Sequence, residues 1–145
     1  CEQLYYLHKG LFRFFRWEDG EEKTKYFTFE DYFFTQQESF FLNRLSNIYI
    51  QALEDSSVLK INKEKLTILH TQISTWSQLA LEVRAEVQVA TESLLINFQC
   101  RTAKERYIAI LEQRPEMVQR VPLKYLASFL GITPESLSRI RKTLS

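Results

Sequence analysis

The fold is decided by one stretch near the end of the chain, VPLKYLASFLGITPESLSRI, which runs from Val121 to Ile140. Two short helices joined by a tight turn can pack together only if a small residue lies where they cross and a glycine takes the turn. Ala127 and Gly131 supply these two residues, four positions apart. The apolar side chains expected between the helices are Leu126, Leu130, Ile132, Leu137 and Ile140. The stretch therefore predicts a helix-turn-helix.

The ends of both helices fit the same interpretation. Pro122 and Pro134 suit the first turn of a helix, because the N–H that proline lacks would have no partner there. The hydroxyl of Thr133 can cap the second helix. A plain helical hairpin is the alternative. It does not require small, glycine, apolar and capping residues together at these positions, so the helix-turn-helix is favoured.

The second helix carries side chains suited to reading bases in the major groove of DNA. Arginine can pair with guanine through two hydrogen bonds, glutamate can accept one from the amino group of cytosine, and serine can reach base or phosphate. The expected base-reading residues are Pro134, Glu135, Ser138 and Arg139. The expected phosphate contacts, which add affinity without sequence information, are Lys124, Thr133, Ser136 and Lys142. The alternative for each is a solvated surface residue.

Positive charge is concentrated at the same end of the chain. The whole sequence has a formal net charge of +1. From Arg120 onward, five basic residues stand against Glu135 alone, which leaves +4 on this segment and −3 on the rest. Such asymmetry indicates a domain that binds a polyanion, although charges clustered on a solvated surface give the same pattern.

The segment from Leu4 to about Ile61 has the pattern of an aromatic-rich antiparallel sheet. Asp19-Gly20 lies between two aromatic runs and predicts a tight hairpin turn. A second hairpin or a long loop is expected between Glu30 and Asn47. The expected strands include 10–17, 25–29, 47–53 and 58–61. We expect the aromatic side chains to fill the core of this sheet, in preference to forming a platform for nucleic-acid bases.

After Asn62 the spacing of the apolar residues changes to that of a helix. A short helix is expected over Lys63–His70, a long one over Trp76–Phe98 and a third over Arg101–Arg114, which Pro115 ends. The long helix, roughly 35 Å at 1.5 Å per residue, exceeds what so small a sheet needs. Its heptad seam consists of Trp76, Ala80, Val83, Val87, Ala90 and Leu94. We expect a homodimer through this seam; packing within the monomer is the alternative.

Composition excludes several classes of protein. Two cysteines, Cys1 and Cys100, and two histidines, His8 and His70, form neither a metal-ligand spacing nor a disulfide framework. We therefore expect no metal, no cofactor and a reduced, cytoplasmic location. No apolar run is long enough to span a bilayer, so no membrane association is expected. Met117 is the only methionine, and we expect upstream sequence to be missing.

The chain resembles the Crp/Fnr regulators over essentially its whole length. The segment from Leu130 to Arg139, LGITPESLSR, is highly specific to this family, and Ala103-Lys104-Glu105-Arg106-Tyr107 resembles the start of its DNA-binding domain. The pattern Glu135-x-x-Ser138-Arg139 is similar to the base-reading signature of the Fnr branch, which implies a TTGA-like half-site. The resemblance also implies a homodimer on a palindromic site and contact with RNA polymerase.

The resemblance implies an α+β fold in three parts. They are a truncated, jelly-roll-like antiparallel β-roll similar to cyclic-nucleotide-binding domains over 1–65, a linker and dimerisation helix over 66–100, and a helix-turn-helix domain over 101–145. We expect the β-hairpin wing common in the family either to be missing or to lie beyond Ser145. Two cysteines cannot supply the four thiolates of the Fnr iron–sulfur cluster.

The expected effector pocket departs from the family's phosphate-binding pattern. That pattern needs a Gly-Glu pair for the ribose and an arginine followed by a small hydroxyl residue for the cyclic phosphate. The corresponding segments are Phe33-Phe34-Thr35-Gln36 and Arg44-Leu45-Ser46-Asn47. Within them, the candidate effector pocket consists of Phe34, Thr35, Gln36, Arg44, Ser46 and Asn47. Without the Gly-Glu pair a cyclic phosphate loses its backbone nest, so we do not expect cyclic AMP as the effector.

Three function classes follow from the sequence. The favoured one is a dimeric, sequence-specific DNA-binding transcription regulator with an unknown small-molecule effector or none. The alternative is a β-roll ligand sensor or protein-interaction module that has lost DNA binding, although such a protein would have no reason to keep Arg139 and Lys142 exposed. An enzyme is the third, and the sequence offers no histidine cluster, nucleophile–base pair or Gly-rich phosphate loop for one.

Overall fold

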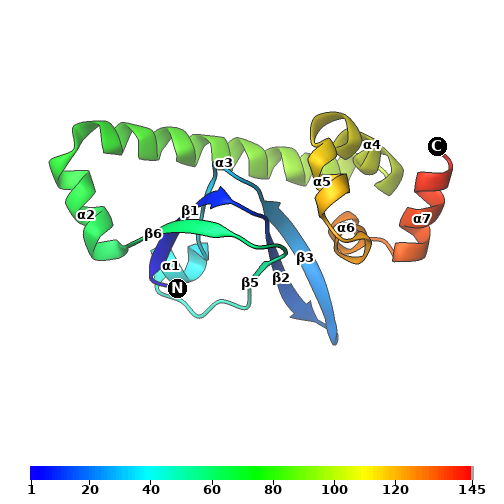
Figure 1. Cartoon of the computed structure of the whole chain (residues 1–145), viewed down its shortest axis with the longest axis horizontal. Coiled ribbons are helices and arrows are strands. Elements are labelled where there is room, and N and C mark those ends of the chain that lie inside the picture. The colour runs from blue at the N-terminus through cyan, green and yellow to red at the C-terminus, as the bar shows by residue number, and fades with distance from the viewer. Residues whose placement is uncertain (145) are drawn as a thin grey trace. The chain divides into compact units, whose positions relative to one another are not determined.

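Strands occupy the first part of the chain and helices the rest. The computed structural model describes residues 1–144 and divides into two compact units, Cys1–Leu79 and Ala80–Ser145. Among the described residues are six strands and seven helices (Figure 1). The α+β fold class expected from the sequence is therefore confirmed. Ser145, the last residue of the predicted DNA-binding domain, lies outside the described residues.

The first unit contains two three-stranded antiparallel sheets. The strands are β1 (Gln3–Lys9), β2 (Phe12–Glu18), β3 (Glu21–Thr28), β4 (Phe33–Phe34), β5 (Tyr49–Ala52) and β6 (Ser57–Asn62). One sheet has the order β4-β1-β6 and the other β3-β2-β5. The turn between β5 and β6 therefore carries the chain from one sheet to the other. The expected strands are confirmed, but those two strands do not pair with each other.

The β2–β3 hairpin turns at Asp19 and Gly20, as predicted. Both residues have positive φ, 53° at Asp19 and 77° at Gly20, which gives the turn a twist that matches the twist of the flanking strands. Pairing begins beside the turn with Glu18 opposite Glu21 and continues to Phe12 opposite Thr28. A register shift between Phe14 and Phe15 changes the alternation once along the ladder.

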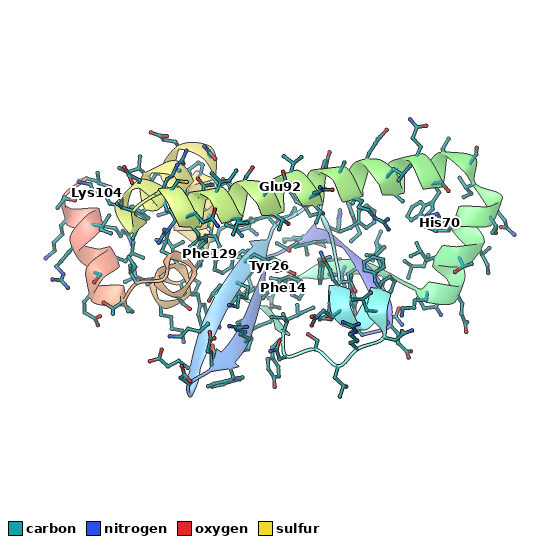
Figure 2. All side chains as sticks on the ribbon, turned by 180° about the vertical axis from the view of Figure 1, so that it is seen from behind. Phe14, Tyr26, His70, Glu92, Lys104 and Phe129 are labelled. Atoms are coloured by element: carbon teal, nitrogen blue, oxygen red, sulfur yellow. The ribbon has the colours of Figure 1, made fainter. Side chains whose placement is uncertain are left out.

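The core of the first unit joins the two sheets. Leu7 from β1, Phe14 from β2 and Phe34 from β4 are buried together. The Phe14 ring stacks on Tyr26 at 4.2 Å between centroids and meets the edge of Phe34 at 5.9 Å; Figure 2 labels Phe14 and Tyr26. Phe29 and Phe40 are also buried. These aromatic side chains fill the core, as the sequence predicted.

The segment between Glu30 and Asn47 contains a helix that the sequence pattern did not predict. After the two-residue strand β4, helix α1 spans Gln37–Leu42. The Gln36 side chain caps it by accepting a hydrogen bond from the Ser39 backbone N–H at 2.6 Å. Asn43 ends the helix with φ of 53°, in the left-handed region that asparagine tolerates. The expected second hairpin is therefore replaced by a short capped helix.

Two helices follow the sheets. Helix α2 spans Lys63–Gln72 and is capped by the Asn62 side chain, which accepts from the Lys65 backbone N–H at 2.9 Å. Helix α3 spans Ser74–Cys100. The break between them is a single residue, Ile73. The two helices predicted here are confirmed, each slightly longer than its sequence pattern.

Four further helices lie in the second unit. They are α4 (Ala103–Gln113), α5 (Pro115–Arg120), α6 (Leu123–Leu130) and α7 (Pro134–Lys142). Pro115 ends the expected helix, and it also starts α5, a helix that the sequence analysis missed. Proline favours the first position of a helix because its fixed φ is already helical there. Among the described residues, no helix is long and apolar enough to cross a membrane.

We predict that Gly10→Ala will destabilise the first unit more than Gly20→Ala. A Cβ at Gly10 would lie 2.8 Å from the Ser56 Cα, and φ is +116°. A Cβ at Gly20 meets nothing within 4 Å, so only its φ of +77° is strained. Strained backbone of this kind costs about 1–3 kcal/mol. Urea unfolding should show the larger loss for Gly10→Ala; equal losses would contradict the close approach of Ser56.

Candidate nucleic-acid interface

The turn between α6 and α7 has the geometry that the sequence predicted. Gly131 ends α6 with φ of 71°, and its N–H donates to the Ser128 carbonyl at 3.1 Å. The N–H of Ile132 donates to the Ala127 carbonyl at 3.0 Å, which completes the closure of the helix end. A Cβ at Gly131 would meet nothing within 4 Å. Glycine is therefore needed here for its backbone conformation, while the space would admit a side chain.

Buried apolar side chains hold the two helices together. Ala127 is fully buried, as expected of the small residue where α6 and α7 meet. Leu126 and Leu130 on α6 and Leu137 on α7 are buried as well. The other two residues predicted for this contact, Ile132 and Ile140, are half-buried. This packing fixes which side of α7 faces away from the protein.

The first turn of α7 is capped as predicted. The Thr133 hydroxyl accepts a hydrogen bond from the Ser136 backbone N–H at 3.2 Å, and Pro134 occupies the first turn. Pro122 differs, because it is the N-cap residue of α6 and not part of its first turn. Hydrogen bonds from the Glu135 backbone N–H and from the Thr133 hydroxyl, with the nearby Arg139, lower the pKa of Glu135. Glu135 is therefore ionised at neutral pH.

The predicted base-reading residues share one side of α7. Glu135, Ser138 and Arg139 are spaced three and four apart, which places them together on a helix surface. Glu135 and Arg139 are exposed and Ser138 is half-buried. Pro134, the fourth predicted base contact, is exposed at the start of the helix. Leu137 is buried on the opposite side, so this surface offers carboxylate, hydroxyl and guanidinium groups to a partner.

The predicted phosphate contacts fall on both helices. Lys142 lies one further turn along the base-reading side of α7 and is exposed. Lys124 is exposed on α6, with its Nζ 4.6 Å from the centre of the Tyr125 ring. The hydroxyls of Thr133 and Ser136 are 3.1 Å apart at the start of α7. Three of the four predicted phosphate contacts thus lie on α7 or at its N-cap, and the fourth, Lys124, lies on α6.

The seam predicted on the long helix is only partly exposed. Its members Trp76, Ala80, Val83 and Leu94 are half-buried, whereas Val87 and Ala90 are exposed. The Trp76 ring meets the edge of Phe33 at 6.4 Å between centroids. At about 100° per residue, a second apolar stripe runs along the opposite side of α3. It consists of Leu81 (66% exposed), Ala85, Val89 (62%) and Ile96 (57%).

The residues predicted to form an effector pocket have structural partners in the first unit. Phe34 is part of the core, and the Thr35 hydroxyl donates to the Gln3 carbonyl at 2.8 Å. Gln36 caps α1, and the Ser46 hydroxyl accepts from the Ile48 N–H at 2.9 Å. Arg44 and Asn47 are exposed. A shallow hollow of about 250 Å³ in this unit is instead lined by Phe40, Phe41, Lys63, Leu66, Thr67 and His70.

One functional candidate in the second unit was missed by sequence reasoning. Arg106 on α4 donates to backbone carbonyls of Arg101 and Leu130, both at 2.7 Å. Any residue type supplies a backbone carbonyl, so no sequence signal identifies these partners.

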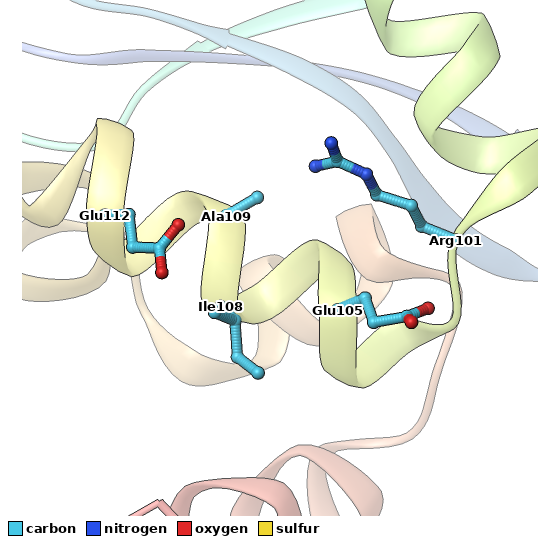
Figure 3. Close-up of a pocket in the computed structure, with 5 residues that line it drawn as sticks. All are labelled: Arg101, Glu105, Ile108, Ala109 and Glu112. Atoms are coloured by element: carbon cyan, nitrogen blue, oxygen red, sulfur yellow. The ribbon is translucent and has the colours of Figure 1, made fainter.

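A hollow of about 280 Å³ beside α4 is lined by Arg101, Glu105, Ile108, Ala109 and Glu112 (Figure 3). Glu105 belongs to the capping box with Thr102 that starts α4.

Comparisons with known proteins identify the fold. No protein-family model matches the chain, and no curated protein matches it. Solved structures do match. FixK2 from Bradyrhizobium japonicum aligns at a TM-score of 0.79 and 19% identity, over 99% of this chain and 74% of FixK2. A regulator of the Crp/Fnr family from Eubacterium rectale aligns at 0.73 and 17% identity, over 99% and 69% of the two chains.

The c-di-GMP-responsive global regulator CLP from Xanthomonas campestris is also similar, with a TM-score of 0.73 and 19% identity over 99% of this chain and 77% of CLP. This chain has the Crp/Fnr fold. The neighbours that share it are regulators, as the resemblance implied. Among residues 1–144, no group of three or more His, Cys, Asp or Glu side chains is arranged to hold a metal ion.

We predict that Thr133→Ala will cost about 1 kcal/mol of stability, the usual loss for an N-cap hydroxyl. It will also raise the pKa of Glu135 toward its ordinary value, because the Thr133 hydrogen bond helps to lower that pKa. Since that pKa is lowered in the folded state, the stability that Glu135 contributes is present above its unfolded pKa and is lost as pH falls through the folded value.

Urea unfolding and carboxyl NMR titration of Glu135 measure the two effects. Thr133→Ser, which keeps a hydroxyl, is the matched control and should stay close to the unmutated protein in both. A Glu135 pKa unchanged in Thr133→Ala would show that the Thr133 hydroxyl does not stabilise the carboxylate.

Proposed function

We propose that this Crp/Fnr-fold protein is a sequence-specific DNA-binding transcription regulator that acts as a homodimer on a palindromic site. The observation that carries the proposal is the exposed side of α7, which presents Glu135, Ser138 and Arg139 while Leu137 anchors the opposite side. A helix held in this way by a helix-turn-helix can enter the major groove and read base edges. The role is not enzymatic.

Charge supports contact with the DNA backbone. Lys142 extends the base-reading side of α7, and Lys124 lies on α6. Both ammonium groups are exposed, so they can approach phosphates without breaking a buried interaction. The first turn of α7 adds backbone N–H groups and the hydroxyls of Thr133 and Ser136, which suit a phosphate at a helix N-terminus. These groups supply affinity, and the base-reading side supplies specificity.

We propose that α3 forms the dimer interface, because its apolar surface is uncovered in the single chain. Leu81, Val89 and Ile96 are each more than half exposed on one side of the helix. An exposed apolar stripe of this kind, interrupted here by Glu92, marks a surface that another chain covers. A second copy fits it, since a two-fold pair sets two recognition helices on a palindrome. The stripe predicted from Trp76 to Leu94 is the alternative interface.

The remaining partners follow from the same proposal. RNA polymerase would be contacted at the promoter, and the location would be cytoplasmic. Any small-molecule effector would differ from cyclic AMP, because the segment from Phe33 to Gln36 lacks the Gly-Glu pair that a ribose needs and Arg44 is exposed. The competing function, a ligand sensor without DNA binding, would leave the charged side of α7 without a role.

Selection of bound duplexes from a random DNA pool tests the proposed function directly. We expect enrichment of a palindrome whose half-sites are similar to TTGA, which would reveal half-site spacing as well. No enrichment of any sequence at low salt would reject DNA recognition and favour the sensor function.

We predict that Arg139→Ala will cost about 1–3 kcal/mol on the selected site and relax the preference for guanine at one position of each half-site. Lys142→Ala should weaken binding to all duplexes to a similar extent and reduce the salt dependence by about one unit for each phosphate that is no longer neutralised. Titrations of both variants against the selected and a scrambled duplex, at several salt concentrations, measure this. Equal weakening on both duplexes by Arg139→Ala would identify Arg139 as a phosphate-binding residue.

We predict that the unmutated protein sediments as a dimer at micromolar concentration and that Val89→Glu dissociates it. The substitution should cost about 3–5 kcal/mol, because it leaves an unpaired charge in the interface. Ser93→Glu, at an exposed position between the two stripes, is the control and should leave the dimer intact. If Val83→Glu dissociates the dimer and Val89→Glu does not, the interface is the stripe predicted from the sequence. A monomeric unmutated protein would reject both.

A further inference from the structure

Arg106 connects three parts of the second unit through its guanidinium group. Its Nη2 donates to the carbonyl of Leu130, the last residue of α6, at 2.7 Å. Its Nη1 donates to the Arg101 carbonyl at 2.7 Å and to the Phe98 carbonyl, in the last turn of α3, at 3.5 Å. The side chain itself belongs to α4. One residue thus bonds to the ends of two other helices.

The electrostatics of helix ends make this arrangement favourable. The last carbonyls of a helix lack partners within the helix and carry the negative end of its dipole. The ends of α3 and α6 both present such carbonyls to Arg106. A guanidinium is planar and always charged, and its two terminal nitrogens can donate hydrogen bonds to two separate acceptors at once. Lysine carries its donors on a single nitrogen, which cannot occupy the positions of both Nη1 and Nη2.

Aromatic packing reinforces the same junction. The Arg106 guanidinium carbon lies 4.5 Å from the centre of the Phe98 ring on α3. That ring in turn meets the edge of Phe129 on α6, with centroids 6.0 Å apart. Phe98 therefore touches both Arg106 and the helix that precedes the recognition helix. Only Arg101 and Thr102 separate α3 from α4 along the chain.

We propose that Arg106 is the positioning residue that sets the orientation of the recognition helix α7 on the end of α3. The carbonyl of Leu130 is adjacent to Gly131, where the turn into α7 begins, so a bond to it restrains the turn. When Arg106 is replaced, the helix-turn-helix keeps its own core but rotates more freely about the Arg101–Thr102 junction. The consequence for DNA, a defined half-site spacing, rests on the proposed function; the restraint itself does not.

The restraint is tested without DNA. Spin labels are placed on α3 by Ser93→Cys, an exposed position between the two apolar stripes, and on α7 by Arg141→Cys, with Cys1 and Cys100 replaced by serine and labelled chains diluted with unlabelled ones. Lys104, which is labelled in Figure 2, has an exposed side chain on the same helix as Arg106 and supplies the control position. Pulsed electron paramagnetic resonance then gives the distribution of distances between the two labels within one chain.

We expect a narrow distribution in the parent protein and in Lys104→Gln, the charge-matched control on α4. Arg106→Gln should broaden it, and Arg106→Lys should broaden it as well, because charge alone does not bridge two helix ends. Far-ultraviolet circular dichroism and unfolding of the helix-turn-helix core should be close to those of the parent. A distribution as narrow in Arg106→Gln as in Lys104→Gln would overturn the proposal.

The consequence for DNA is measured on unlabelled proteins with duplexes whose half-sites are separated by different spacers. Arg106→Gln should lose about tenfold in affinity at the preferred spacing while its affinity for a single half-site stays within twofold, so the spacing preference flattens. An unchanged spacing profile, or an equal loss on all duplexes, would overturn the positioning role. If the parent binds no duplex, the proposed function fails, and the label distances still decide whether Arg106 restrains α7.

Discussion

The left-handed conformation of Gly131 is the constraint on which the recognition surface depends. It ends α6 within one residue, and only Ile132 and Thr133 remain before α7 begins at Pro134. So short a connection leaves α7 no freedom to rotate about its own axis once Leu137 is buried against α6. The direction in which Arg139 points is therefore determined by a backbone angle eight residues earlier, together with the close approach that fully buried Ala127 allows.

Predictions from the sequence succeeded where a local requirement left a visible residue. The Asp19-Gly20 turn, the long helix α3 and the helix-turn-helix each need particular residues at fixed spacings, and the chain has them. Helices α1 and α5 were missed because each has six residues, too few to display a helical period. Pro115 was read only as a helix end, although the same residue also opens the next helix.

Tertiary relations were harder to infer than local ones. Heptad spacing identified α3 but not which of its sides is covered, because Trp76 finds an aromatic neighbour in Phe33, which is remote in sequence. The hydroxyl and amide groups of Thr35 and Gln36 seemed free for a ligand, yet they bond to nearby backbone. The role of Arg106 left no sequence signal, since its partners are carbonyl oxygens that every residue possesses.

The continuity of helix α3 limits how its length can change. It runs from Ser74 to Cys100 without a break, and the boundary between the two compact units falls inside it, after Leu79. An inserted or deleted residue in α3 would turn every later side chain by about 100° relative to those before it. We therefore expect substitutions at exposed positions of α3 to disturb the protein less than a change in the length of the helix.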